Sequence, residues 1–349
     1  MKRALEVARL VLAGEDAWVV GGAVRDRPLG RQVLDLDVVC REPKNAAYRF
    51  ARESEGSPFS LSEQHGAWRV SLADGRTADF TPLRGTITDD LALRDFTVNA
   101  IAEPLAGGET VDPFGGRRDL DEGLLRVVSD RVFDEDPLRL LRAVRLEQEL
   151  GLRLEAGSEA LLRRNAERVT KPSGERILSE LERLDWRGLE RLDALGLLGP
   201  LGGSLALAGR IDRSLVDSPR LRLVTVLGER LRALPISGEL DRYLGVLLRA
   251  QPPEDGSPRQ IHRFRRASEP WALDALAFLG RGEFADVVRV ARESEPEEPL
   301  LRGDELGIAP GPLVGELLEL IAEERAAGTI STREEALALV RSRRGAQEL

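Results

Sequence analysis

Two aspartates separated by one residue are the first candidates for chemistry in this chain of 349 residues. Asp35 and Asp37 belong to an alternating segment that predicts a β-strand, and the two-residue period of a strand puts both carboxylates on one face. Adjacent carboxylates repel each other unless a proton or a cation lies between them, and a site built only from oxygen ligands suits Mg²⁺. The alternative is a solvated strand face or a turn.

A third carboxylate, Asp79, lies in the middle of a second predicted strand, 76–83. If it came from a neighbouring strand, it would complete a two-metal site that activates a hydroxyl and stabilises a leaving pyrophosphate. The alternative is a surface aspartate on an edge strand. The candidate catalytic and metal-binding residues are therefore Asp35, Asp37 and Asp79.

Two further segments suit a nucleotide. Gly21 and Gly22 follow a short β-prone run and precede a predicted helix that carries Arg25, and glycines at such a turn let backbone amides approach a phosphate. Arg94 and Asp95 begin a segment that gathers a guanidinium, a carboxylate, a hydroxyl and an amide, which suit a ribose and a triphosphate. The alternatives are an ordinary turn and a polar loop entering the core.

Charged residues recur every three positions in a helix predicted over 137–149, at Asp136, Arg139, Arg142 and Arg145. Cytosine and adenine each present an amino donor beside a ring-nitrogen acceptor, so a neighbouring Asp136 and Arg139 suit these bases. Uracil and guanine present the opposite pattern and would leave buried groups unpaired. Arg142 and Arg145 are then free to hold phosphates. The alternative is an amphipathic helix with ion pairs at spacing three.

The elements that must position these residues divide the chain into an α/β part and a helical part. Strand patterns end near residue 131, and helical spacing predominates afterwards. Asp74-Gly75 predicts a hairpin between two of the strands. The expected strands are 17–20, 33–40, 58–61, 67–72 and 76–83, with sheet edges at 100–103 and 110–111. Beyond 43–53 and 137–149, the expected helices include 158–168, 174–184 and 313–325.

Composition excludes several classes of protein. The single cysteine, Cys40, excludes an intramolecular disulfide and a multi-cysteine zinc site. The net charge of −9 argues against a general nucleic-acid coat, although a local basic groove remains compatible with it. No segment approaches the roughly 20 apolar residues of a membrane span, and the leucine-rich N-terminus carries charges that interrupt a secretory core. We therefore expect a cytoplasmic protein with no membrane partner.

Taken in order, the motifs closely resemble the class II tRNA nucleotidyltransferases, the family of bacterial CCA-adding enzymes and poly(A) polymerases. The resemblance covers nearly the whole chain. It rests on Gly21-Gly22-Ala23-Val24-Arg25-Asp26, Asp35-x-Asp37, Arg94-Asp95-Phe96-Thr97-Val98-Asn99-Ala100, Val111-Asp112-Pro113-Phe114-Gly115-Gly116, Glu135-Asp136-Pro137-Leu138-Arg139, Glu175-Arg176-Ile177 with Glu180, and Gly303-Asp304-Glu305-Leu306.

The resemblance implies an α+β fold, with a small mixed α/β nucleotidyltransferase head followed by an all-helical neck, body and tail. The implied divisions are a catalytic head at 1–128, a neck with base recognition at 129–190, a body at 191–285 and a tRNA-binding tail at 286–349. The implied reaction adds C, and also the terminal A in full CCA-adding members, to the 3′ end of tRNA without a nucleic-acid template. The tRNA 3′-hydroxyl attacks the α-phosphate of CTP or ATP, and pyrophosphate leaves.

Specific residue roles follow from the same resemblance. Asp35 and Asp37 are implied to hold two Mg²⁺ ions, and Asp136 with Arg139 to pair with the incoming base. Nucleotide contacts are implied for Gly21, Gly22, Arg25, Arg94, Asp95, Asp136, Arg139, Arg142 and Arg145. The acceptor arm of tRNA is implied to lie along the helical part. Candidate basic clusters there are 163–171, 259–266 and 341–344, and the alternative for each is a solvated helix face.

Two departures from the family pattern bear on specificity. Leu93 stands where many members have arginine, which removes one cationic contact. The connection 85–92 is short, whereas many full CCA-adding members carry a longer flexible loop there that the last A requires. The short connection favours CC addition, with a separate A-adding enzyme acting on the same tRNA. The alternatives are a poly(A) polymerase and a catalytically silent RNA-binding scaffold.

Overall fold

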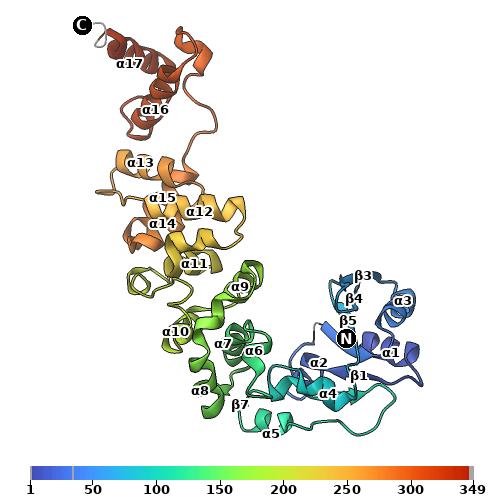
Figure 1. Ribbon diagram of the computed structural model, residues 1–349. Helices are drawn as coiled ribbons and strands as arrows, with labels where there is room; N and C mark the ends of the chain where they lie inside the picture. Colours follow the sequence, from blue (N-terminus) through green and yellow to red (C-terminus); the bar gives the residue numbers. More distant parts are fainter. Residues whose placement is uncertain (1, 34, 346–349) are drawn as a thin grey trace. The chain divides into compact units, whose positions relative to one another are not determined.

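The computed structural model describes residues 2–33 and 35–345, and the chain divides into two units, Met1–Leu201 and Gly202–Leu349 (Figure 1). The first unit contains a six-stranded sheet followed by helices. All the elements described in the second unit are helices. This arrangement confirms the predicted α+β class, whereas the finer division into head, neck, body and tail stays a prediction.

The sheet has the strand order β3-β4-β5-β2-β1-β6. Strands β2 and β5 run parallel, and every other neighbouring pair is antiparallel. The predicted strands are confirmed, and Val111 extends the sheet by a single bridge to Ala102. The bounds are β1 Ala17–Val20, β2 Asp35–Cys40, β3 Ser57–Ser62, β4 Ala67–Ser71, β5 Thr77–Pro82 and β6 Ala102–Pro104.

The predicted hairpin joins β4 to β5. Gly75 has φ +81°, which glycine adopts without strain, and its N–H donates to the Leu72 carbonyl at 3.0 Å. The turn fixes the register of the two strands, so that Arg69 lies opposite Asp79.

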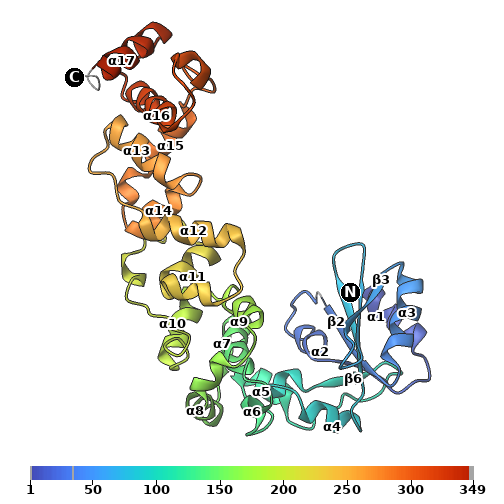
Figure 2. The same cartoon turned by 45° about the horizontal axis from the view of Figure 1, so that its top comes forward.

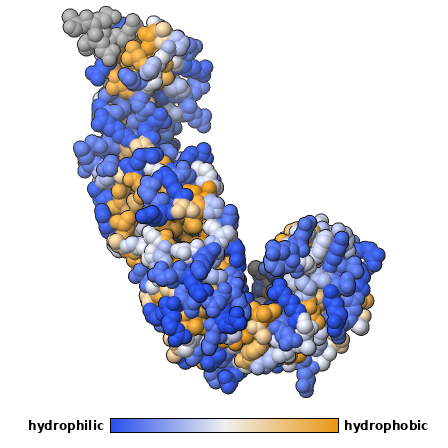
Figure 3. Space-filling model, in the orientation of Figure 1, coloured by the Kyte–Doolittle hydropathy of each residue, from blue (hydrophilic) through white to orange (hydrophobic). Residues whose placement is uncertain are grey.

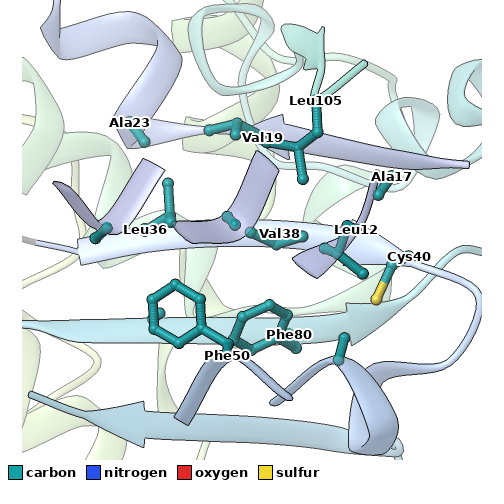
Figure 4. Close-up of a cluster of buried hydrophobic side chains, with 14 of the residues drawn as sticks. Leu12, Ala17, Val19, Ala23, Leu36, Val38, Cys40, Phe50, Phe80 and Leu105 are labelled. Carbon is teal, nitrogen blue, oxygen red and sulfur yellow. The ribbon is translucent and has the colours of Figure 1, made fainter. Parts of the chain in front are cut away.

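Helices α1 (Lys2–Val11) and α3 (Pro43–Ser54) contribute to the core on one face of the sheet (Figure 2). Leu36, Val38 and Cys40 of β2 alternate into this core (Figure 4). The rings of Phe50 and Phe80 meet there with centroids 5.3 Å apart. Because alternate residues of β2 are committed to this core, Asp35 and Asp37 lie on the other face.

The other face of the sheet is partly covered as well. Val20 and Val39 pack there with Leu91 of α4 (Ile87–Ala92) and with Ala100 and Ala102. The cover comes from the chain after β5, which includes the 3₁₀ helix Thr97–Asn99. The segment that carries Arg94 and Asp95 is thereby placed against the face of Asp37.

The rest of the first unit is helical, apart from two short strands. Strand β7 (Leu124–Leu125) pairs in parallel with β8 (Arg153–Leu154), a pairing that the sequence patterns did not predict. The helices predicted over 137–149, 158–168 and 174–184 are present with shifted bounds. The helices are α2 Gly22–Asp26, α5 Gly116–Asp121, α6 Val132–Glu135, α7 Arg139–Leu150, α8 Ala156–Arg164, the 3₁₀ helix Ala166–Thr170, α9 Gly174–Leu181 and α10 Trp186–Ala194.

Among the described residues of the second unit, two apolar clusters are separate from each other. One gathers Ile261, Phe264, Leu276 and Val288, and the other gathers residues of α16 and α17 around Leu317. Helix α15, which begins at the predicted boundary between body and tail, packs into the first cluster. The helices are α11 Pro219–Leu227, α12 Gly238–Arg249, α13 Pro258–Ser268, α14 Ala272–Leu279, α15 Ala285–Glu293, α16 Pro312–Ala326 and α17 Arg333–Gly345, with 3₁₀ helices at Ala208–Arg210, Gly228–Ala233, Gly282–Phe284 and Gly303–Leu306.

Hydrophilic residues cover most of the face drawn in Figure 3, with hydrophobic residues scattered among them. Within the described residues, no helix has the length and apolar character needed to cross a membrane.

The buried thiol of Cys40 provides a test of the head fold. Burial raises its pKa to about 12, so almost no thiolate exists at pH 8. We expect the native protein to resist a colourimetric thiol reagent at pH 8 and to react with one equivalent after unfolding in urea. Rapid stoichiometric labelling of the native protein would contradict the placement of Cys40 in the core.

Candidate active site

Asp35 and Asp37 share one face of β2, and β5 extends that face. The parallel register places Asp37 opposite Asp79 and Asp35 opposite Thr77. Thr77 Oγ1 donates a hydrogen bond of 2.7 Å to Asp35 Oδ1. The three carboxylates predicted from the sequence therefore lie on one face of two adjacent strands.

Arg69 binds Asp79 from the next strand. Its Nε and Nη2 donate to the two carboxylate oxygens of Asp79, each over 2.7 Å. Among the residues that the structure describes, no three histidine, cysteine, aspartate or glutamate side chains are grouped as a metal site. The role of Asp79 as a third metal ligand stays a prediction, because that role requires Arg69 to release it.

Asp37 lies in an environment that disfavours its negative charge. Burial, together with the carboxylates of Asp79 and Asp35, raises the pKa of Asp37 to about 6, although Arg94 and Arg69 oppose the shift. A divalent cation between Asp35 and Asp37 would relieve this repulsion. Proteins often hold Mg²⁺ through one or two carboxylates together with substrate phosphates and water, so this oxygen-only pair fits the ion.

The glycine turn approaches the carboxylates closely. Gly21 has φ +66°, and a Cβ at this position would lie 3.2 Å from Arg94 Nη1 and 3.5 Å from Asp37 Oδ2. The left-handed backbone conformation therefore favours glycine, and a Cβ here would also crowd the guanidinium of Arg94. Helix α2 begins at Gly22, so the turn brings Arg25 into the same region.

A chain of polar contacts joins α2 to α7 through the segment after α4. Arg25 Nη1 donates to Asn99 Oδ1 at 2.5 Å, and Asn99 Nδ2 donates to Asp95 Oδ1 at 2.9 Å. Arg142 Nε and Nη2 both donate to Asp95 Oδ2, at 2.9 and 2.6 Å. The structure therefore connects Arg25, Asp95 and Arg142, which lie far apart in the sequence.

Asp95 stays ionised although it is buried. Burial by itself would raise its pKa, but the charge of Arg142 and hydrogen bonds from Asn99, Arg142 and the Phe96 N–H outweigh burial and hold the pKa at about 2. The carboxylate accepts every one of these hydrogen bonds. Asp95 is thus an internal anchor in this structure.

Asp136 and Arg139 lie at the elbow between α6 and α7. Asp136 Oδ1 accepts from the Leu138 N–H at 3.1 Å, and its Oδ2 accepts from Arg176 Nη2 at 2.7 Å. Arg139 Nη2 donates to the Leu93 carbonyl at 2.6 Å. Since Leu93 precedes Arg94, which lies beside Gly21, the elbow is connected to the carboxylate site.

The comparisons with known proteins all point to one family. A family model described as the poly A polymerase head domain matches residues 17–86 and 68–126. The chain is 32% identical to the A-adding tRNA nucleotidyltransferase of Deinococcus radiodurans, over 93% of this chain and 94% of that protein. It is 31% identical to the CC-adding tRNA nucleotidyltransferase of Thermus thermophilus, over 96% and 95%.

The chain belongs to the class II tRNA nucleotidyltransferase family. Solved structures agree with this assignment. The Thermotoga maritima CCA-adding enzyme in complex with tRNA matches with a TM-score of 0.79 at 25% identity, over 98% of this chain and 96% of that one. A CCA-adding enzyme in complex with CTP matches with a TM-score of 0.83, at the same identity and coverage. The protein is therefore a nucleotidyltransferase.

Two arginines of this nucleotidyltransferase differ from the sequence-based expectation. Arg142 and Arg145 were expected to be free for phosphates, but in this structure both guanidinium groups are paired with carboxylates, and their contact with the nucleotide stays a prediction. Arg145 is buried and donates to Glu180 at 2.6 Å and to Glu149 at 2.8 Å. A buried arginine needs such partners, and Glu149 at spacing four on α7 was a signal for one of them.

Arg69 is a site residue that the sequence reasoning missed. The predicted hairpin contained the signal, because the turn at Asp74-Gly75 places Arg69 directly across from Asp79. Cross-strand pairs of opposite charge stabilise each other at this separation.

Several arginines of the candidate RNA-binding clusters are paired within the protein. Arg168 forms an ion pair with Asp134 at 2.6 Å. On α13, Arg259 and Arg263 contact Glu323 of α16, and Arg266 contacts Glu319. The side chain of Arg344 lies outside the described residues. Contacts of these clusters with RNA stay predictions.

The Asp95 anchor predicts a specific loss of stability. Asp95→Asn removes the charge that balances Arg142 and leaves one acceptor oxygen for three side-chain donors. We expect a loss of about 2–4 kcal/mol in the free energy of unfolding of the first unit, because removing one member of a buried ion pair leaves the other uncompensated. Urea titration followed by tryptophan fluorescence measures this change. An unchanged urea midpoint would contradict the role of Asp95 as an internal anchor. The control is Asp74→Asn at an exposed position.

Proposed function

We propose that this nucleotidyltransferase adds two C residues to the 3′ end of tRNA. CTP is the nucleotide donor, no nucleic acid acts as template, and pyrophosphate is released. The observation that carries the proposal is the connection of the carboxylate pair to the Asp136–Arg139 elbow through Arg94 and Leu93. This connection brings the carboxylates proposed for phosphoryl transfer and the pair proposed for base selection together in the first unit. Relatives and structural neighbours named for CC addition, A addition, tRNA and CTP support the choice of substrates.

Asp35 and Asp37 are the proposed ligands of Mg²⁺. When bound, the metal lowers the pKa of the attacking tRNA 3′-hydroxyl and stabilises the leaving pyrophosphate. Arg94 is the proposed phosphate ligand, because its buried Nε has no hydrogen-bond partner and its Nη1 lies beside Gly21. The protein groups act by positioning and by stabilising charge, without a covalent intermediate.

Base selection is assigned to Asp136 and Arg139. An ionised carboxylate only accepts hydrogen bonds and a guanidinium only donates them. Cytosine offers an amino donor to the first and a ring-nitrogen acceptor to the second, whereas uracil offers the reverse. A wrong base leaves hydrogen-bonding groups of Asp136 and Arg139 unpaired. The free-energy penalty is larger there than for a hydrogen bond missing in water, where solvent takes the partner's place.

The segment Gly85–Ala92 favours CC addition over complete CCA addition. Thr86 and Asp89 form a capping box at the start of α4, in which Asp89 Oδ2 accepts from the Thr86 N–H at 2.8 Å. Leu91 is fully buried, and Asp90 pairs with Arg94 at 3.3 Å. The segment is therefore a packed helix, whereas the family's A addition is associated with a longer flexible loop. A separate A-adding enzyme then completes the tRNA end.

Sequence identity does not separate the related activities, because the A-adding and CC-adding relatives are 32% and 31% identical to this chain. The match to a poly A polymerase head keeps that polymerase as a second candidate. Addition of long A tails to any RNA would support it. A silent RNA-binding scaffold would bind tRNA without incorporating nucleotides.

Single-nucleotide incorporation tests the proposal. Labelled tRNA without its 3′ end and a second tRNA ending in CC are each incubated with Mg²⁺ and with CTP, ATP or both. We expect two C additions to the first tRNA and no A addition to the second. Addition of A to the CC-ending tRNA would establish a complete CCA-adding enzyme and contradict the argument from α4.

The metal assignment predicts the effect of removing each carboxylate of β2. We expect Asp35→Ala and Asp37→Ala to lower incorporation by about a thousandfold or more, because charge stabilisation by a bound metal is worth several kcal/mol. Binding of tRNA, measured by gel shift, stays close to that of the wild type. Asp16→Ala, at an exposed head position paired with Arg41, is the control. Incorporation at the wild-type rate in either variant would rule out the assignment.

A further inference from the structure

Both residues of the proposed base-contacting pair already have hydrogen-bond partners within the protein. Asp136 Oδ2 accepts from Arg176 Nη2 of α9 at 2.7 Å. Arg139 Nη2 donates to the backbone carbonyl of Leu93, just after α4, at 2.6 Å. We call these two hydrogen bonds the resting contacts.

The resting contacts have the same donor and acceptor pattern as a correct base. Asp136 accepts from an N–H group, as it would from the amino group of cytosine. Arg139 donates to a carbonyl oxygen, as it would to the ring nitrogen of cytosine. The protein therefore satisfies both side chains in the way that cytosine does.

We propose that the resting contacts occupy the base-contacting pair between additions, and that an incoming cytosine replaces Arg176 on Asp136 and the Leu93 carbonyl on Arg139. The inference rests on the proposed function, because it takes Asp136 and Arg139 as the base-contacting pair. Arg176 acts as a competitor of the base for Asp136. It does not hold Asp136 in place for the base.

The exposure of the side chains fits such an exchange. The side chain of Arg176 is 51% exposed, so its guanidinium is hydrated by water when it leaves Asp136. The side chain of Arg139 is only 16% exposed, but it also contacts Glu135 at 3.3 Å and keeps this partner when it leaves the Leu93 carbonyl. Neither arginine becomes an unpaired buried charge during the exchange, which is the outcome that would cost most.

The exchange has a consequence for two successive additions. After the first addition, the new 3′-terminal base must leave Asp136 and Arg139 before a second CTP binds. Arg176 takes Asp136 back as that base departs. The resting contacts therefore favour release of the added base from Asp136 and Arg139 before the next CTP binds.

Arg176→Ala tests the competition. We expect CTP to bind two- to fivefold more tightly in equilibrium titrations without tRNA, because a part-exposed ion pair contributes a factor of this order. The KM for CTP should fall similarly, with little change in kcat for the first addition. The ratio of kcat/KM for CTP to that for UTP stays constant, since both nucleotides compete with the same contact.

Arg183→Ala is the matched control. Arg183 follows α9, is 54% exposed and pairs with Glu149 at 3.4 Å. The two variants lose the same charge, and loss of a positive charge by itself weakens binding of an anionic nucleotide. If CTP binds more tightly to Arg176→Ala but not to Arg183→Ala, the change in overall charge does not explain the difference.

The possible outcomes are distinct. Weaker or unchanged CTP binding in Arg176→Ala, or a smaller preference for CTP over UTP, would overturn the competition and assign Arg176 a positioning role. Failure of the wild-type protein to bind CTP would instead contradict the proposed function. Circular dichroism checks the helices, and Arg176→Met, which keeps the aliphatic length of the side chain, replaces Arg176→Ala if the alanine variant is misfolded.

Discussion

The carboxylate of Asp95 is buried between α7 and the segment that follows α4. It accepts hydrogen bonds from Arg142, Asn99 and the Phe96 N–H, and its pKa of about 2 keeps it charged at physiological pH. Asn99 in turn binds Arg25 of α2. A single interior charge therefore links α2, the Arg94 segment and helix α7 in one frame. The phosphate and base contacts proposed above depend on this frame.

The face that carries the candidate catalytic carboxylates depends on the division of β2 into two sides. Leu36, Val38 and Cys40 are buried against α1 and α3, which leaves the carboxylates no place on that side. The side of Asp37 collects negative charge, and burial, together with the carboxylates of Asp79 and Asp35, raises the pKa of Asp37. A divalent cation with bound phosphates, as proposed for Asp35 and Asp37, would balance this negative charge.

The chain is rich in arginine, and the carboxylate partners of these arginines limit which guanidinium groups a ligand can contact. Buried or part-buried guanidinium groups are paired with carboxylates, as in Arg69–Asp79 and Arg145–Glu180. A ligand that needs one of these charges must exchange partners with the protein. The side chain of Arg176 is 51% exposed, whereas that of Arg145 is only 7% exposed, so water can hydrate the first far more readily than the second if its carboxylate partner leaves.

The sequence by itself determined the local geometry. Strand alternation placed Asp35 and Asp37 on one face, the Asp-Gly turn produced the hairpin, and the order of motifs indicated the family, because each of these signals acts over a few residues or is carried by residue identity. Only the tertiary structure decided which charges are paired. Arg142 meets Asp95 and Arg176 meets Asp136 across more than 35 residues of sequence. No local period encodes such partners, since they depend on how the helices pack against the sheet segment and against one another.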